Sequence, residues 1–479
     1  MRKFQTKLHR RGKPFCCQQS YRKHEIVKHT LFAFICLFLL SCDTANKQVN
    51  KAEIIQDLLD SLYKENIFNG AIVVADGEAV ILSKGYGYTN FKDSVPFTVN
   101  TPGDGGSLAK TFTTAALWKL QVLGKINLND SVQKFLPEYP YANTTVLDLL
   151  THGAGGLPGY DFFFSKINDS TILTNEMMAS LLGKYKPPLL DSTKTSFNYE
   201  NTGIDLAALI IEKITGKGYQ QVLSELFFQP LNMNATYVRP PNLADINLKR
   251  AVGYARRNDS LVLHDIADRE GFYGSCNLHF TTADLCKWGQ SFYEKDLNKD
   301  IPKEAAEPAK ISGKSSGLNR LNWYYANNKK AFYYWGNVFG FYSHLYHDDE
   351  KKFTIAFITN TTLPYSLRQP FASALAEIME TGKYEKQQFI LPDLIPIKDP
   401  GSFCGTYRSG AGNDIVISGN KDLLHIQRND ELRYNLYIVD SVTAYAPGID
   451  AWINFTKQQN RTLLLWNTIF FREKAFKNS

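Results

Sequence analysis

A serine and a lysine three positions apart, Ser107 and Lys110, are the first residues of this chain whose types and spacing suggest chemistry. The residues from 108 to 123 have a helical pattern that ends at Gly124, so Ser107 would begin a helix and Lys110 would lie one turn later on the same face. A neutral lysine amine in that place accepts the proton of a serine hydroxyl, and the helix N-terminus stabilises negative charge nearby. The pair predicts a serine nucleophile with a lysine as its first base.

This spacing is weak when it stands alone. Four other Ser-x-x-Lys matches occur in the chain, beginning at Ser20, Ser61, Ser131 and Ser418. A short motif gains meaning only from its structural context. Ser107 differs from the others because Gly105 and Gly106 precede it and a nearly all-apolar helix follows it, and we therefore take Ser107 as the candidate nucleophile.

The elements that must hold this pair are indicated by hydrophobic periodicity. Three further helices are predicted over residues 51–66, 202–215 and about 366–381. Two β-branched runs around Asp76-Gly77 predict a hairpin, and residues 341–359 predict another. A helix and hairpin at the start and a hairpin and helix at the finish favour one antiparallel sheet assembled from both ends of a domain. The middle of the chain would form a helical lobe, so the fold class is α+β.

The C-terminal part has a different pattern. Residues 393–401 are rich in proline and aspartate and predict a linker. Only short alternating runs separated by turn residues follow, so residues 402–479 predict a small all-β domain, a barrel or sandwich. The expected organisation is a leader (1–41), a tether (42–50), a main domain (51–392), the linker (393–401) and the β domain (402–479).

Longer segments carry a resemblance to a known family. The stretch from Ser107 to Pro140 and the segment TTVLDLLTHGAGGLPGY resemble the serine β-lactamase and penicillin-binding-protein superfamily. The most similar branch holds class C β-lactamases, D-alanyl-D-alanine carboxypeptidases and related esterases. The resemblance runs from about Phe68 to Leu375, and the β domain resembles the lipocalin-like tail of some members. It implies a β-lactamase/transpeptidase-like fold and a serine hydrolase that forms an acyl-enzyme on an amide or ester bond, without a cofactor.

The resemblance also implies further site residues. In the family a Tyr-x-Asn motif follows the Ser-x-x-Lys motif, and it matches Tyr199 and Asn201 here. Tyr199 would shuttle a proton between Ser107 and the leaving group, and Asn201 would hydrogen-bond the substrate and Lys110.

The third family motif is Lys-Thr-Gly or His-x-Gly, on a strand that edges the site. It matches Tyr334-Trp335-Gly336, which keeps the glycine and lacks the basic residue. A tyrosine hydroxyl donates a hydrogen bond and brings no charge, so recognition of β-lactams and D-Ala-D-Ala ends is in doubt. The backbone N–H groups of Ser107 and Asn337 would form the oxyanion hole.

The approach to the nucleophile departs from the family as well. The family has alternating bulky residues where this chain has Gly103-Asp104-Gly105-Gly106. Glycines lose much conformational freedom on folding. The run therefore predicts either an unusual approach loop or a poorly organised site.

The first residues predict export. A basic stretch precedes an apolar run of about ten residues that ends at Ser41-Cys42, which is typical of a signal peptide. The sequence around Cys42 resembles a lipobox, so the expected protein is a lipoprotein anchored through Cys42 that faces the periplasm or cell surface. Residues 1–41 hold nine of the 54 Lys and Arg residues and one of the 47 acidic residues, so the rest of the chain is nearly neutral. A nucleic-acid partner is therefore not expected, and the substrate would be a small peptide, ester or cell-wall fragment.

The same residues allow three other interpretations. A nucleophile elbow of an α/β hydrolase needs a buried apolar strand before the serine, which the glycine run cannot supply. A metal site is not expected, because His344 and His347 would point to opposite faces of one strand and Cys276, Cys286 and Cys404 have no zinc spacing. A catalytically impaired binding or scaffolding lipoprotein on the same fold remains the alternative function.

Overall fold

The architecture comes from a computed structural model of the chain. It describes residues 49–241, 250–257, 260–266, 269–292, 301–326, 331–363, 365–384, 403–409, 413–420, 424–428, 434–438, 441–446, 451–458, 461–467 and 472–477. The predicted leader, Cys42 and the linker at 393–401 lie outside these ranges. No helix of the described ranges has the length and apolar character needed to cross a membrane.

An eight-stranded sheet forms the centre of the main domain. Its order is β10-β11-β12-β13-β14-β15-β1-β2, so the first two strands of the chain lie beside the last one of the domain. The strands are β1 (Gly70–Asp76), β2 (Ala79–Tyr86), β10 (Pro308–Ile311), β11 (Lys314–Asn319), β12 (Tyr324–Ala326), β13 (Ala331–Val338), β14 (Phe341–Asp348) and β15 (Phe353–Thr359). β1 pairs antiparallel with β15, with Gly70 opposite Thr359. The prediction of one sheet built from both ends of the domain is confirmed.

Each face of this sheet has its own hydrophobic core. Side chains alternate between the faces, so neighbouring residues of a strand enter different cores. On one face pack α2 (Lys51–Lys64) and α10 (Tyr365–Thr381), whose apolar side chains bury Ile72, Val74 and Phe357. On the other face α9 (Thr282–Gln290) and the helical lobe bury Val73, Ala356 and their neighbours.

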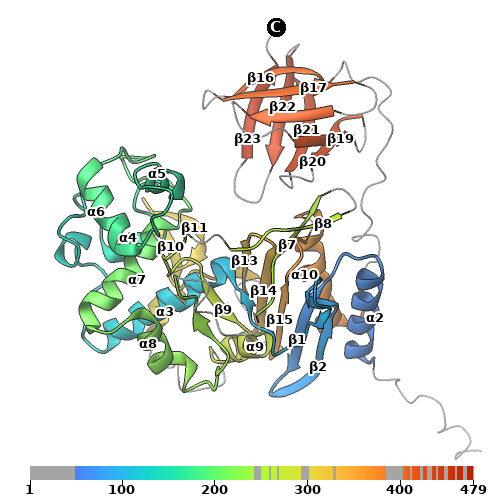
Figure 1. The fold of residues 1–479 in the computed structure, drawn as a ribbon, viewed down its shortest axis with the longest axis horizontal. Coiled ribbons are helices and arrows are strands. Elements are labelled where there is room, and N and C mark those ends of the chain that lie inside the picture. The colour runs from blue at the N-terminus through green and yellow to red at the C-terminus, as the bar shows by residue number, and fades with distance from the viewer. Residues whose placement is uncertain are drawn as a thin grey trace, which may run out of the picture. The chain divides into compact units, whose positions relative to one another are not determined.

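The middle of the chain forms the helical lobe (Figure 1). It holds α3 (Ala109–Val122), α4 (Val146–Leu150), α5 (Tyr160–Phe164), α6 (Asn175–Tyr185), α7 (Thr202–Thr215) and α8 (Tyr219–Leu223). α7 has the predicted bounds, because Gly216 adopts the left-handed conformation that ends a helix (φ +66°). Ten of its residues are buried, so α7 is the central helix of the lobe.

Short elements connect the sheet to the lobe. Gly103–Asp104 (β5) pairs with Leu278–Phe280 (β9), which also pairs with Tyr237–Val238 (β6). Two further pairs are β3 (Tyr88–Asn90) with β4 (Val95–Pro96) and β7 (Tyr254–Arg257) with β8 (Ser260–Leu263). Single helical turns are η1 (Gly106–Leu108), η2 (Val132–Lys134), η3 (Ser224–Phe228) and η5 (Lys303–Ala306). The run β5–η1–α3 carries the chain from strand to nucleophile to helix.

The C-terminal domain is a closed barrel of eight antiparallel strands. They are β16 (Gly405–Ser409), β17 (Asp414–Gly419), β18 (Leu424–Arg428), β19 (Tyr434–Ile438), β20 (Thr443–Ala446), β21 (Ala451–Gln458), β22 (Arg461–Asn467) and β23 (Arg472–Lys477). β16 closes the barrel by pairing with β23. Its interior holds alternate residues such as Tyr407, Ile417 and Ile426 in a core separate from those of the main domain. The predicted all-β domain is confirmed as a barrel.

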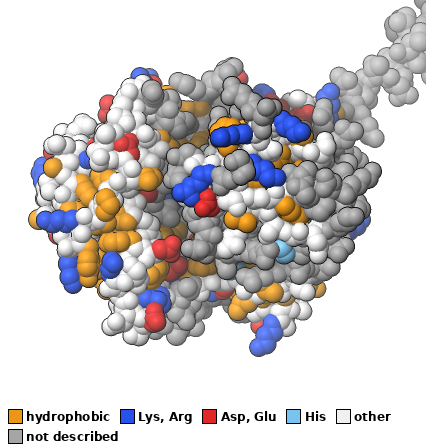
Figure 2. Space-filling view, turned by 90° about the horizontal axis from the view of Figure 1, so that it is seen from above, with side chains coloured by type: hydrophobic (Ala, Val, Ile, Leu, Met, Phe, Trp, Pro, Cys, Tyr) orange, Lys and Arg blue, Asp and Glu red, His pale blue; other side chains and the backbone are white. Residues whose placement is uncertain are grey.

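Acidic and basic side chains are interspersed on the described part of the surface in Figure 2, among hydrophobic and neutral ones. Neither sign forms a continuous band on that face. Cys276 and Cys286 are not joined to each other by a disulfide.

Candidate active site

Ser107 receives hydrogen bonds from two candidate catalytic side chains. Lys110 Nζ lies 3.0 Å from Ser107 Oγ, and the hydroxyl of Tyr199 donates to the same oxygen over 2.9 Å. Ser107 lies in the turn η1 just before α3, so Lys110 comes one turn later on the inner face of the helix. The structure thus brings together the three side chains that the sequence predicted as catalytic, at distances that allow direct proton transfer.

Lys110 is fully buried, which requires compensating groups. Its Nζ also donates to the carbonyl oxygen of Ser275 over 2.9 Å. Two buried carboxyls, of Glu200 and Asp205, lie near enough for the Lys110 charge to act on them. Burial raises the pKa of Glu200 to about 8 and that of Asp205 to about 6, and the charge of Lys110 opposes both shifts.

Asp205 holds the backbone that receives Lys110. Its Oδ1 accepts the N–H of Ser275 at 2.8 Å, and its Oδ2 accepts the Tyr160 hydroxyl at 2.7 Å. The Tyr160 hydroxyl also lies 2.8 Å from Ser275 Oγ. Asp205 therefore fixes Ser275, and Ser275 in turn holds Lys110. Asp205 was not among the predicted site residues, although an acidic residue inside the apolar stretch of α7 is a visible signal in the sequence.

His152 holds the loop that carries Tyr199. Its Nδ1 accepts the N–H of Glu200 at 3.3 Å, and its Nε2 lies 3.1 Å from Asn322 Oδ1. Burial lowers the pKa of His152 to about 3, so the ring is neutral, and it lies against the Tyr199 ring with centroids 4.6 Å apart. These contacts give His152 the role of a residue that stabilises the loop rather than that of a base.

Asn201 is placed differently from what the resemblance implied. Within the described ranges Lys110 donates to Ser107 and Ser275, and no hydrogen bond joins it to Asn201. The Oδ1 atom of Asn201 is buried and has no partner there. Asn201 directly precedes α7 and is not among the described residues that border the pocket over Ser107, so its contact with substrate stays a prediction.

The glycines before the nucleophile are tightly packed. A Cβ on Gly105 would lie 2.1 Å from the ring of Phe280, and one on Gly336 would lie 1.8 Å from Gly105 O. Gly106 has φ +52° and its Cβ would lie 2.9 Å from the Asn337 nitrogen. Only glycine permits these approaches, and they bring the backbone of Asn337 against the turn that carries Ser107. This is the arrangement that an oxyanion hole built from these two residues requires.

Hydrogen bonds fix the same approach loop. Asp104 Oδ1 accepts the N–H of Gly106 at 2.8 Å, and Ser343 Oγ donates to Gly105 O at 2.7 Å. Asp104 is fully buried, and burial raises its pKa to about 6. Of the two possibilities left by the sequence, the structure favours an unusual but well-held approach loop.

Aromatic rings line the pocket over Ser107. The pocket measures about 70 Å³ and is bordered by Ser107, Phe197, Tyr199, Tyr324, Tyr334, Trp335 and Asn337. Tyr334 is 2% exposed, and its hydroxyl lies 3.4 Å from that of Tyr199. Burial raises the Tyr334 pKa well above its usual value, so this hydroxyl is neutral. Trp335 stacks on Tyr324 with ring centroids 4.8 Å apart. Tyr334 stands where the resemblance places a basic residue, and no Lys or Arg is among the described residues that border the pocket.

A metal centre finds no support in the described residues, where no group of three or more His, Cys, Asp or Glu side chains converges. His344 packs under α10 and His347 bonds Thr354, in different parts of β14.

The family model named Beta-lactamase matches residues 52–378, about two thirds of the chain. This chain belongs to the beta-lactamase family. The matched residues contain Ser107, Lys110, Tyr199 and Tyr334, together with every strand of the eight-stranded sheet.

Relatives extend the likeness beyond the matched domain. Penicillin-binding protein 4* of Bacillus subtilis (strain 168) is 23% identical over 431 residues, which cover 85% of this chain and 94% of that protein. Protein flp of Staphylococcus aureus (strain NCTC 8325 / PS 47) is 24% identical over 316 residues, 64% of this chain and 62% of that protein.

Solved structures of beta-lactamase relatives share the fold. The octameric penicillin-binding protein homologue from Pyrococcus abyssi superposes with a TM-score of 0.58 and 22% identity, covering 89% of this chain and 99% of that one. FmtA from Staphylococcus aureus gives a TM-score of 0.57 and 23% identity, covering 71% and 92%. At these identities the likeness establishes the fold alone.

Proposed function

We propose that this member of the beta-lactamase family is an active serine hydrolase that works through an acyl-enzyme. The observation that supports it is the double contact of Ser107 Oγ with Lys110 and Tyr199. Ser107 Oγ attacks the substrate carbonyl and passes its proton to one of these two groups. The leaving group takes a proton as it departs, and water then attacks the ester on Ser107 and restores the free hydroxyl.

The pocket walls favour an uncharged acyl group. Five aromatic side chains border the pocket, and the neutral Tyr334 hydroxyl occupies the place of the family cation. A carboxylate there would lose its hydration without gaining a charge partner, which is costly. We therefore propose a neutral ester or amide with an apolar acyl part as substrate, in preference to a carboxylated β-lactam or a D-Ala-D-Ala end.

Covalent labelling tests this function. Intact mass is measured after incubation with a fluorophosphonate and, separately, with a penicillin, with Ser107→Ala as the control. We expect a Ser107-dependent adduct with the phosphonate and none with penicillin. A penicillin adduct would contradict the proposed substrate class, and the absence of both adducts would contradict the hydrolase.

The alternative is a binding or scaffolding protein on an impaired hydrolase fold. Two observations favour it: the pocket is only about 70 Å³ in volume, and Tyr334 replaces the basic residue. Under this alternative, Ser107→Ala leaves every ligand interaction unchanged and no ester in a panel is turned over.

The export of the chain is a separate proposal. We infer from the apolar run and Cys42 that the protein is made as a lipoprotein and held at a membrane outside the cytoplasm. Mass spectrometry of the mature N-terminus tests this. A first residue other than Cys42, without added lipid mass, would refute the lipid anchor and leave the hydrolase proposal untouched.

A further inference from the structure

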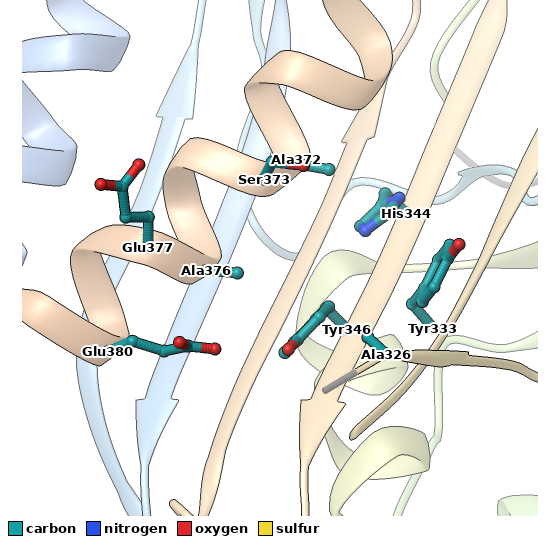
Figure 3. A pocket seen from close by; sticks show the side chains of 9 residues that line it. All are labelled: Ala326, Tyr333, His344, Tyr346, Ala372, Ser373, Ala376, Glu377 and Glu380. Atoms are coloured by element: carbon teal, nitrogen blue, oxygen red, sulfur yellow. The ribbon is translucent and has the colours of Figure 1, made fainter. Parts of the chain in front are cut away.

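A second and larger cavity lies between α10 and the strands of the sheet (Figure 3). Its volume is about 310 Å³, which falls at the lower end of the range of about 300–1,000 Å³ for small-molecule sites. Tyr333 borders this cavity whereas Tyr334, the next residue of β13, borders the Ser107 pocket. The described residues that border the two pockets are all different, so the two sites are separate.

Small side chains of α10 leave the space open. Ala372 and Ala376 lie one turn apart on the face of α10 that is directed to the sheet, and Figure 3 shows both methyl groups pointing toward the strands. The opposite wall consists of His344 and Tyr346 from β14 together with Tyr333 from β13. The cavity is therefore a gap between a helix and an aromatic wall.

His344 is the polar group that the fold leaves unsatisfied in this wall. It is 2% exposed, and among the described residues neither of its ring nitrogens has a hydrogen-bond partner. Its ring stacks on Phe357 with centroids 5.3 Å apart. Burial lowers the pKa of His344 to about 3, so the ring is neutral and offers one acceptor nitrogen and one donor N–H. A buried polar group without a hydrogen-bond partner lowers the stability of the fold. A ligand that hydrogen-bonds to His344 would remove this cost.

The charges at the cavity select a cation. Glu377 and Glu380 border it, and Figure 3 shows the Glu380 carboxylate extending toward Tyr346. Lys351 pairs with Glu380 at 2.9 Å and offsets its charge, so Glu377, Glu380 and Lys351 together leave one negative charge at the rim. Aromatic faces such as those of Tyr333 and Tyr346 attract cations within about 6 Å. A carboxylate ligand would be repelled by the same rim.

We propose that this cavity binds a small organic cation, an amine or ammonium group on an apolar body. The ammonium N–H donates to the acceptor nitrogen of His344, the apolar body fills the space beside Ala372 and Ala376, and the charge lies between the tyrosine faces and the glutamates. This site is independent of the hydrolytic site, and its occupation is not required for Ser107 to react.

Three probes of matched shape test the ligand class. Benzylammonium, benzyl alcohol and benzoate are titrated into the full mature chain at pH 7 by isothermal calorimetry. We expect benzylammonium to bind at least ten-fold more tightly than benzyl alcohol and benzoate to give no saturable heat. Equal binding of all three, or preference for benzoate, would overturn the proposal.

Two variants locate the bound probe. Ala376→Leu fills the cavity and should abolish benzylammonium binding, whereas Ala142→Leu adds the same side chain at an exposed position of the lobe and should not. Glu380→Gln should weaken benzylammonium at least five-fold and change benzyl alcohol less than two-fold, with the exposed Glu176→Gln as control. Binding to Ala376→Leu as tight as to the wild type would refute this location.

His344→Phe tests the site even if Ala376→Leu fails to fold. Phenylalanine keeps the ring and removes the two unsatisfied nitrogens, so thermal stability should rise while benzylammonium affinity falls at least five-fold. An unchanged affinity would show that His344 is only a buried packing residue. Phosphonate labelling of Ser107 should stay at the wild-type rate in all of these variants, which separates failure here from failure of the hydrolase.

Discussion

Asp205 touches no reacting atom, yet three contacts connect it to the base. Its carboxylate accepts hydrogen bonds from the Ser275 N–H and the Tyr160 hydroxyl, and the carbonyl oxygen of Ser275 accepts a hydrogen bond from Lys110. Asp205→Asn keeps the shape, removes a negative charge near Lys110 and replaces one acceptor with a donor. Because small displacements of catalytic groups are costly, we expect phosphonate labelling of Ser107 to slow about 10- to 100-fold.

The rate of labelling, measured by intact mass over time, checks this prediction. Asp169→Asn is the matched control, since the Asp169 side chain is fully exposed and pairs only with Arg269 at the surface. A labelling rate within two-fold of the wild type would show that Ser275 holds Lys110 without help from Asp205.

Glu200 makes stability depend on pH. Burial raises its pKa from 4.5 to about 8, so the folded chain holds this proton more tightly than the unfolded chain does. The favourable contribution is complete below pH 4.5 and is lost as pH rises toward 8. Glu200→Gln stays neutral at every pH. The free energy of unfolding of Glu200→Gln should therefore be higher than that of the wild type at pH 9. This difference should be a few kcal/mol larger at pH 9 than at pH 5, because each unit of pKa shift corresponds to about 1.4 kcal/mol.

Urea unfolding at the two pH values measures this difference. The exposed Glu176→Gln serves as control and should show no such change between pH 5 and pH 9. If Glu200→Gln gains nothing at high pH, the carboxyl of Glu200 is ionised in the folded state and pairs with Lys110.

At the scale of elements, strand β13 positions the nucleophile turn by direct backbone contact. Gly336 allows the carbonyl of Gly105 to approach, and a methyl group there would lie 1.8 Å from that oxygen. Gly336→Ala must push the turn away from Asn337, so we expect loss of phosphonate labelling by two or more decades. We expect Gly159→Ala to label normally, because a methyl group at Gly159 meets nothing within 4 Å.

The main helices and hairpins could be predicted because their signals are local. Apolar spacing and a terminal glycine defined α7, and the Asp76-Gly77 turn defined the hairpin of β1 and β2. Ser107, Lys110 and Tyr199 were predicted because short motifs on those elements match a known family. The three-stranded sheet of β5, β9 and β6 was not predicted, since strands of two or three residues have no periodicity and pair across large sequence separations.

The contacts that hold the catalytic residues in place could not be predicted from the sequence either. The packing of Gly105 against Phe280 and of Asp205 under Ser275 depends on residues far apart in the chain. A glycine run has the same composition whether it is loose or compressed, and only the tertiary contacts distinguish these states.

At the scale of the whole molecule, the barrel and the main domain have separate hydrophobic cores. Ile417 is 1% exposed within the barrel core. Ile417→Ala leaves a cavity there that should cost about 2–5 kcal/mol of barrel stability, while the Ser107 labelling rate at 25 °C stays unchanged. Calorimetry and labelling of the same sample measure both effects.

Leu209→Ala in the core of α7 is the reciprocal variant. It should lower the stability of the main domain and slow Ser107 labelling, because α7 carries Asp205. If Ile417→Ala slows labelling as much as Leu209→Ala, the two cores are energetically coupled.

The pairing of β1 with β15 limits the order in which the parts of this chain can fold. Residues 70–76 must wait for residues 353–359, almost three hundred positions later, before the sheet can be completed. Such distant pairings fold slowly. An emerging chain therefore keeps one edge of β1, a strand that is almost entirely buried in the folded domain, unpaired through most of synthesis. It also makes the first hairpin the natural target of any chaperone that escorts the chain.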